Sequence, residues 1–161
     1  MERESEKNKV KSATHLTINT TLIFISFTIF TFIASVNSII LKDNFLLTIQ
    51  LVLSIPFFMS SILSRAKLGI LSNSKKVDEF GHLTFTIAYA FLINVVGILL
   101  VNLVSLQASL IFFGVNIALT LIYSVIMTIE EKKKLRERIM KDLFFILVIV
   151  IGGILPVLGV Y

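Results

Sequence analysis

The chain lacks the residues on which several kinds of site depend. Its 161 residues include no Cys and no Trp, and only two Pro and two His. Without Cys there is no disulfide, thiolate metal site or thiol nucleophile. The sequence also contains no GxxxxGK[ST], HExxH or GxSxG motif. It therefore predicts a protein that is not an enzyme and that holds no cofactor or metal.

Charge is missing from five long apolar stretches. Hydrophobic residues make up 56% of the chain, and the mean hydropathy is +0.94. A soluble domain of this length cannot bury so much apolar surface. Each stretch is near or above the roughly 20 residues that a helix needs to cross a bilayer. We predict an all-α integral membrane protein with five transmembrane helices, at residues 16–41, 45–64, 83–106, 108–129 and 143–161.

Basic residues are distributed very unevenly between the two sides of these predicted helices. Fourteen of the 15 Lys and Arg fall in the tail 1–15 and the loops 65–82 and 130–142, and Lys42 is the exception. Basic residues that flank membrane spans stay on the cytoplasmic side. We therefore predict one membrane domain that crosses the cell (inner) membrane several times, with a cytoplasmic N-terminus and a C-terminus outside.

A short pattern occurs twice. Lys-Val, four further residues and His-Leu-Thr begin at Lys9 and again at Lys76, 67 residues later. The same offset places Lys67 on Lys134. We interpret this as a duplicated two-helix hairpin followed by a fifth helix, with the two hairpins related by an axis along the membrane normal. The alternative is that any two helices entering from the basic side share this order of basic, interfacial and apolar residues.

Uncharged polar residues recur within the predicted spans in steps of three and four. Such steps keep side chains on one helix face. An unpartnered polar group in hydrocarbon is costly, so we expect these faces to point inward. In the first span the stripe is Thr21, Thr28, Thr31, Ser35 and Ser38. In the later spans the candidate interior or pore-lining residues are Gln50, Asn94, Asn102, Asn116, Thr120 and Ser124.

Two interpretations of these stripes remain open. The polar side chains either form hydrogen bonds between packed helices, or line a water-filled path. The second interpretation needs an oligomer, because four helices of one chain fill their own centre. Asn116 is expected to face Asn94, Asn102 or a second copy of its own helix.

A cluster of basic residues precedes the last span. Lys132, Lys133, Lys134, Arg136 and Arg138 are candidates for contact with anionic lipids. The alternative is that they only keep this loop in the cytoplasm. No soluble fold accompanies the charge, so nucleic acid is not an expected partner.

The function expected from the sequence is that of a small polytopic membrane protein. We expect self-association in the lipid bilayer, as a homo-oligomeric channel or membrane-permeabilising component. The alternative is a non-conducting accessory, sensor or scaffold subunit that binds another membrane protein.

Overall fold

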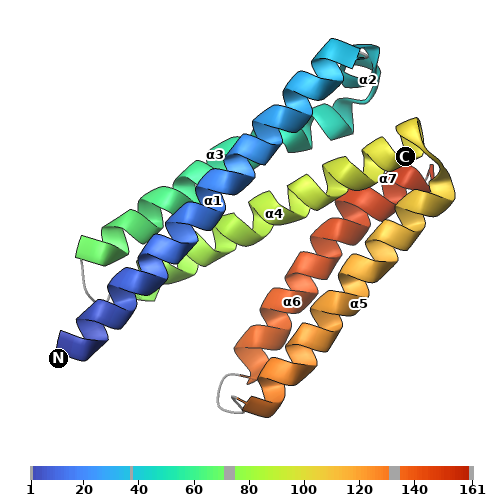
Figure 1. Cartoon of the computed structure of the whole chain (residues 1–161). Coiled ribbons are helices and arrows are strands. Elements are labelled where there is room, and N and C mark those ends of the chain that lie inside the picture. Colours follow the sequence, from blue (N-terminus) through green and yellow to red (C-terminus); the bar gives the residue numbers. More distant parts are fainter. Residues whose placement is uncertain (1, 37, 71–74, 131–134, 160–161) are drawn as a thin grey trace. The chain divides into compact units, whose positions relative to one another are not determined.

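The computed structural model describes residues 2–36, 38–70, 75–130 and 135–159, and these residues contain helices and no strand (Figure 1). The helices are α1 (Glu2–Val36), α2 (Ser38–Asp43), α3 (Phe45–Ile70), α4 (Lys75–Leu103), α5 (Leu106–Glu130), α6 (Leu135–Ile149), the π-helix η2 (Val150–Ile154) and α7 (Leu155–Val157). The predicted all-helical class is confirmed for the described residues.

Five segments among the described residues are long and apolar enough to cross a membrane, which confirms the predicted number. They are Ser12–Val36, Phe45–Leu68, Lys75–Leu103, Leu106–Ile126 and Ile139–Val157. Their ends differ from the charge-free stretches. α1 begins at Glu2, and α3 continues to Ile70. Lys, Arg and Glu favour helices nearly as much as Leu does, so a charged residue marks the end of an apolar stretch without ending the helix.

Two short turns are fixed by N-caps. The Leu47 N–H donates to Asn44 Oδ1 over 3.0 Å at the start of α3, and the Ala108 N–H donates to Ser105 Oγ over 3.2 Å at the start of α5. Such caps satisfy N–H groups that have no partner within the helix. Ser105 follows Asn44 by 61 positions, and the shortfall from the repeat offset of 67 equals the 6 residues of α2. The two caps therefore do not lie at matching positions of the repeat, and the duplication stays a prediction.

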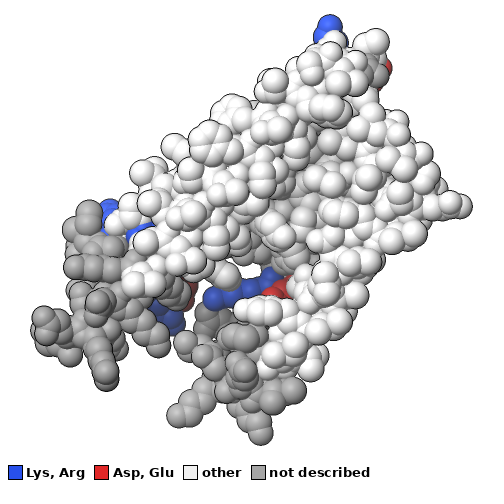
Figure 2. Space-filling view, in the orientation of Figure 1, with Lys and Arg blue, Asp and Glu red and all other residues white. Residues whose placement is uncertain are grey.

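The helices form two compact units, residues 1–89 and 90–161, with the division inside α4. In unit 1, the first of these, α1 and α3 lie side by side and antiparallel, and α2 joins them at one end (Figure 1). In unit 2, the second, α5 packs beside α6. The space-filling view shows uncharged atoms along the middle of α1, with charged atoms near the ends of the hairpin formed by α1, α2 and α3 (Figure 2).

The interface between α1 and α3 follows a heptad spacing. The buried and half-buried positions of α1 include Ser12, His15, Asn19, Leu22, Ser26, Ile29 and Ile33. The matching buried positions of α3 are Leu47, Leu51, Ser54, Phe58, Ser61 and Arg65. Alternating steps of three and four average 3.5 residues, the repeat of two helices that pack side by side at a small crossing angle.

Unit 2 is built around one aromatic ring. Phe113 of α5 is fully buried and forms a core with Ala90, Ile93, Phe145 and Ile149. Two glycines border this ring. A Cβ atom on Gly97 would overlap the ring of Phe113. A Cβ atom on Gly153, within η2, would stand 2.6 Å from the ring's Cζ. The two glycines thus leave the space that the ring occupies.

Candidate functional site

Four polar residues lie at the centre of the interface between α1 and α3, and we call Asn19, Ser26, Ser54 and Ser61 the polar seam. Asn19 Nδ2 donates to Ser61 Oγ over 3.1 Å, and Ser61 Oγ donates to the carbonyl oxygen of Gly81 over 2.8 Å. The hydroxyl oxygens of Ser26 and Ser54 lie 3.4 Å apart. Ser61 therefore joins α1, α3 and α4 within unit 1.

Gly81 permits the close approach between α3 and α4 on which this bond depends. A Cβ atom at Gly81 would stand 2.8 Å from Ser64 Cβ. Ser64 Cβ is attached directly to the backbone and cannot rotate away, so a larger residue at position 81 would push the two helices apart. The hydrogen bond from Ser61 to the Gly81 carbonyl would lengthen as a result.

An ion pair lies at the end of unit 1 where α3 ends and α4 begins. Arg65 Nη1 of α3 contacts Asp78 Oδ1 of α4, with side-chain exposures of 6% and 47%. Ser12 Oγ of α1 donates to the carbonyl oxygen of Arg65 over 2.7 Å. A buried guanidinium needs a partner of opposite charge, because an uncompensated charge away from water is strongly destabilising. The pair therefore holds the start of α4 against α3.

The hydroxyl stripe predicted for the first span is exposed on the side of α1 away from α3, so it takes no part in the packing of α1 on α3. The exposed residues Thr14, Thr17, Thr21, Thr28, Thr31 and Ser35 form what we call the hydroxyl face of α1. Thr28 lies two residues beyond buried Ser26, which places it about 200° around the helix. The hydroxyl face is thus nearly opposite the polar seam.

Local hydrogen bonds explain why these hydroxyl groups tolerate exposure. Thr21 Oγ1 donates to the Thr17 carbonyl over 3.0 Å, and Thr28 Oγ1 donates to the Phe24 carbonyl over 2.8 Å. Thr14 and Thr17 make the same bond to the residue four positions earlier. A hydroxyl that donates to its own helix leaves no donor unsatisfied and needs no second helix.

The polar residues predicted for the later spans differ in burial and in hydrogen-bond partners. Gln50 and Asn94 are buried, whereas Asn102 is exposed. Asn94 Nδ2 donates to the Val148 carbonyl of α6 over 3.2 Å, which links two helices of unit 2. Asn102 Nδ2 donates to the Ile98 carbonyl of its own helix.

The predicted residues of α5 form one half-buried line. Asn116, Thr120 and Ser124 are half-buried, and most of the residues around them are exposed. Asn116 Nδ2 donates to the Phe112 carbonyl over 2.8 Å, and Thr120 Oγ1 donates to the Asn116 carbonyl. The amide of Asn116 therefore bonds its own helix rather than the expected Asn94 or Asn102.

The predicted basic cluster falls largely outside the described part of the chain. Lys132, Lys133 and Lys134 lie outside the described residues. Of Arg136 and Arg138 the structure describes only the backbone, within α6. The contact predicted between this cluster and anionic lipid stays a prediction.

The sequence predicted an inward-facing stripe on the second span that includes Ser54 and Ser61, and both are buried. It did not predict the α1 half of the polar seam, Asn19 and Ser26, or the Arg65–Asp78 pair. A signal for the seam was present, because Ser12, Asn19, Ser26 and Ile33 follow one another at intervals of seven. The ion pair gave no comparable signal, since both partners belong to a stretch predicted to be a loop.

Comparison with known proteins gives no relative for this chain. No protein-family model matches it, and neither does any curated protein or solved structure. The contacts within the two units are therefore the basis for a functional proposal.

Proposed function

We propose that this chain is a multi-pass membrane protein that assembles as a homo-oligomer, in which the hydroxyl faces of α1 from several subunits surround a water-filled path. One observation carries the proposal. α1 packs on α3 through one face and leaves a second, hydroxyl-rich face exposed on nearly the opposite side. An uncharged helix face that is rich in hydroxyl groups, with exposed Phe24 between Thr21 and Thr28, is suited to a path for small polar solutes or ions.

Two buried asparagines support the assignment of packing to buried polar residues and of the lining to exposed hydroxyl groups. Asn19 and Asn94 donate to partners on other helices of their own units. These buried amides act as packing contacts, which leaves the exposed hydroxyls of α1 as the candidate lining. The proposed lining of the path is therefore Thr21, Thr28 and Thr31, in place of the residues predicted in the later spans.

The proposed orientation follows the basic residues. The N-terminus lies in the cytoplasm, and residue 161 lies outside, in the cell (inner) membrane. The test uses a reporter that is active only outside the cytoplasm. Fused after Tyr161 it should be active, and inserted between Asn73 and Ser74 it should be inactive. Activity at the internal site would contradict the orientation.

A second candidate is a non-conducting accessory, sensor or scaffold subunit. The observation that favours it is the set of bonds from α1 hydroxyls to carbonyls of the same helix. Side chains satisfied in this way do not require water and can face another membrane protein. Small polar side chains also let helices approach closely in a bilayer.

Neighbouring threonines provide a test with a matched control. Thr20 and Thr21 are both exposed, and each donates to the carbonyl four residues earlier, over 2.9 and 3.0 Å. Thr20 points about 100° away from Thr21 and about 80° away from Thr28 around α1, at the edge of the hydroxyl face beside Thr31. We would compare Thr21→Leu and Thr28→Leu with Thr20→Leu.

The measurements are the mass of the purified full chain in mild detergent and ion flux through liposomes that contain it. The proposal expects an oligomeric mass in all forms, flux in the wild type and the Thr20→Leu variant, and flux reduced at least about tenfold in the two face variants. A monomeric wild type would contradict the proposal. An oligomer without flux would favour the accessory role.

A further inference from the structure

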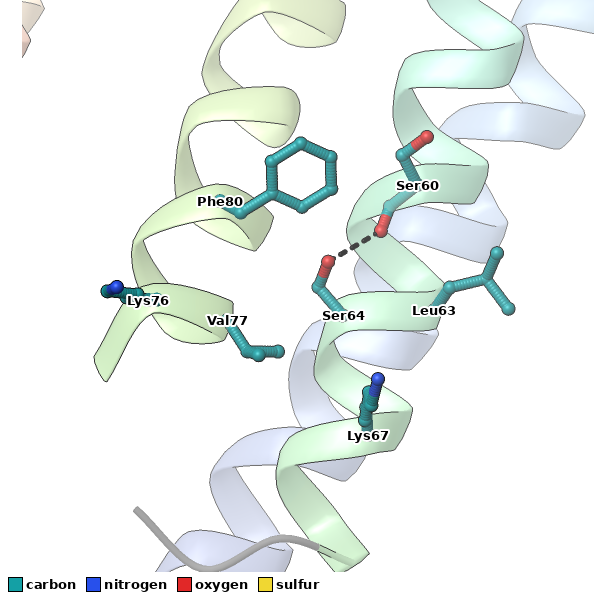
Figure 3. A pocket seen from close by; sticks show the side chains of 7 residues that line it. All are labelled: Ser60, Leu63, Ser64, Lys67, Lys76, Val77 and Phe80. Carbon is teal, nitrogen blue, oxygen red and sulfur yellow. Dashed lines mark hydrogen bonds between the residues drawn. The ribbon is translucent and has the colours of Figure 1, made fainter. Parts of the chain in front are cut away.

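A groove opens between α3 and α4 at the charged end of unit 1. Its volume is about 350 Å³, and its lining consists of Ser60, Leu63, Ser64, Lys67, Lys76, Val77 and Phe80 (Figure 3). In Figure 3, Val77 and Phe80 of α4 face the side of α3 that carries Ser64, and Lys76 lies at the outer edge. The groove falls within unit 1.

The lining changes from basic to apolar along the two helices. Lys67 lies seven residues beyond Ser60 on α3, which corresponds to about 10 Å along the axis. On α4, Phe80 lies one helical turn beyond Lys76, or about 6 Å. Leu63 and Phe80 are exposed, at 66% and 52%. One end of the groove is therefore cationic, and the other presents apolar surface.

The charge in the groove has one sign. Lys67 and Lys76 are exposed, and neither forms an ion pair with any side chain that the structure describes. The nearby acidic residues have other partners: Asp78 contacts Arg65, and Glu79 contacts Lys75 at 3.5 Å. Lysine side chains keep their ammonium groups at a membrane surface while their stems lie along apolar groups.

We propose that this groove binds one anionic glycerophospholipid of the surrounding bilayer. The phosphate of the headgroup lies between the ammonium groups of Lys67 and Lys76, the glycerol region lies beside Ser64, and an acyl chain runs along Leu63 and Phe80 towards Ser60. A basic pocket between membrane helices on the cytoplasmic side is suited to such a headgroup. The proposal requires insertion in a membrane but no self-association.

The experiment is native mass spectrometry of the purified full chain in mild detergent, titrated with phosphatidylglycerol or phosphatidylcholine. The first phosphatidylglycerol should bind at least about tenfold more tightly than phosphatidylcholine. Lys67→Gln with Lys76→Gln should weaken phosphatidylglycerol binding by about 25-fold, or about fivefold for each lysine. Lys75→Gln is the matched control, because Lys75 adjoins Lys76 but does not line the groove, and it should leave binding within about twofold.

Two more variants distinguish binding in the groove from binding elsewhere on the chain. Ser60→Leu fills the groove without changing its charge and should also weaken phosphatidylglycerol binding. Lys132→Gln, Lys133→Gln and Lys134→Gln together should not reproduce the loss. The proposal is overturned if that triple variant alone loses binding, if phosphatidylcholine binds equally well, or if inorganic phosphate displaces the lipid. The last result would assign the lysines to free phosphate.

Discussion

Among the described residues, each of the two units buries one asparagine between helices, yet the surroundings of the two amides differ. Asn19 of unit 1 is 1% exposed and meets the serine hydroxyls of the polar seam. Asn94 of unit 2 is 0% exposed and meets the Val148 carbonyl beside the ring of Phe113 and Gly153. The asparagine of unit 1 therefore takes part in side-chain hydrogen bonds in series, and the asparagine of unit 2 lies beside an aromatic ring that fills a space left by glycines.

The difference is instructive for a chain that we propose to lie in a bilayer. Lipid tails are as apolar as leucine side chains, so burial of apolar surface does not by itself drive helices together there. Close packing and interhelical hydrogen bonds remain as the attractive terms. The polar seam of unit 1 is an example of interhelical hydrogen bonding, and the core around Phe113 in unit 2 is an example of close packing, so the two places should respond differently to substitution.

The largest effect is expected from filling the space around Phe113. Gly97→Ala adds a Cβ atom that overlaps the ring, whereas Gly114→Ala adds one with no heavy atom within 4 Å. Overpacking typically destabilises by about 1–3 kcal/mol. In an SDS titration from mild detergent, Gly97→Ala should lower the free energy of unfolding by that amount. Equal stability of the two variants would contradict the packing of unit 2.

The next effect concerns the ion pair of unit 1. Asp78→Asn leaves the buried Arg65 without a charged partner. Breaking a fully buried pair costs about 3–5 kcal/mol, but Asp78 is half-exposed and solvent screening reduces the expected loss to about 1–2 kcal/mol. Glu79→Gln is the control, because its partner Lys75 is exposed, and it should change the free energy of unfolding by less than about 0.5 kcal/mol. The pair would be dispensable if both variants unfolded alike.

A smaller effect is expected within the polar seam. Asn19→Leu removes the donor to Ser61, while Ser61 keeps its own bond to the Gly81 carbonyl. Hydrogen bonds between membrane helices contribute about 0.6–2 kcal/mol. Because Asn19 Oδ1 is buried and has no hydrogen-bond partner among the described residues, its removal offsets part of this loss, and we expect about 1 kcal/mol. Thr20→Leu, on the adjacent exposed position, should be neutral in the same titration.

The sequence predicted the five long helices because absence of charge over about 20 residues is a property of each segment alone. Which face of α1 is buried was not predictable in the same way. On α1 the hydroxyl face carries more polar residues than the side that contributes Asn19 and Ser26 to the polar seam. Counting polar residues therefore selects the exposed face of the helix. The buried face of α1 is instead marked by the seven-residue spacing of Ser12, Asn19, Ser26 and Ile33, which matches the spacing of Leu47, Ser54 and Ser61 on α3.

The packing of unit 2 was also beyond the sequence. Gly97, Phe113 and Gly153 are far apart along the chain, and no local pattern indicates that one ring lies against both glycines. The Arg65–Asp78 pair was missed for a related reason. Charged residues past the end of an apolar stretch were assigned to a loop, although α3 and α4 both continue through them.

The smallest effect is expected at Asn116, and it sharpens the contrast with Asn94. Asn116→Leu removes an amide that donates to the Phe112 carbonyl of its own helix. That carbonyl keeps its place within the helix, and Leu inserts readily into a bilayer. The free energy of unfolding should therefore change by less than about 0.5 kcal/mol. Asn94→Leu should instead lose about 1 kcal/mol, because its amide reaches α6. An SDS titration of both variants measures the difference. A loss above about 1 kcal/mol for Asn116→Leu, accompanied by a lower mass in detergent, would show that this residue bonds a second subunit through α5 and would place the subunit contact there rather than on α1.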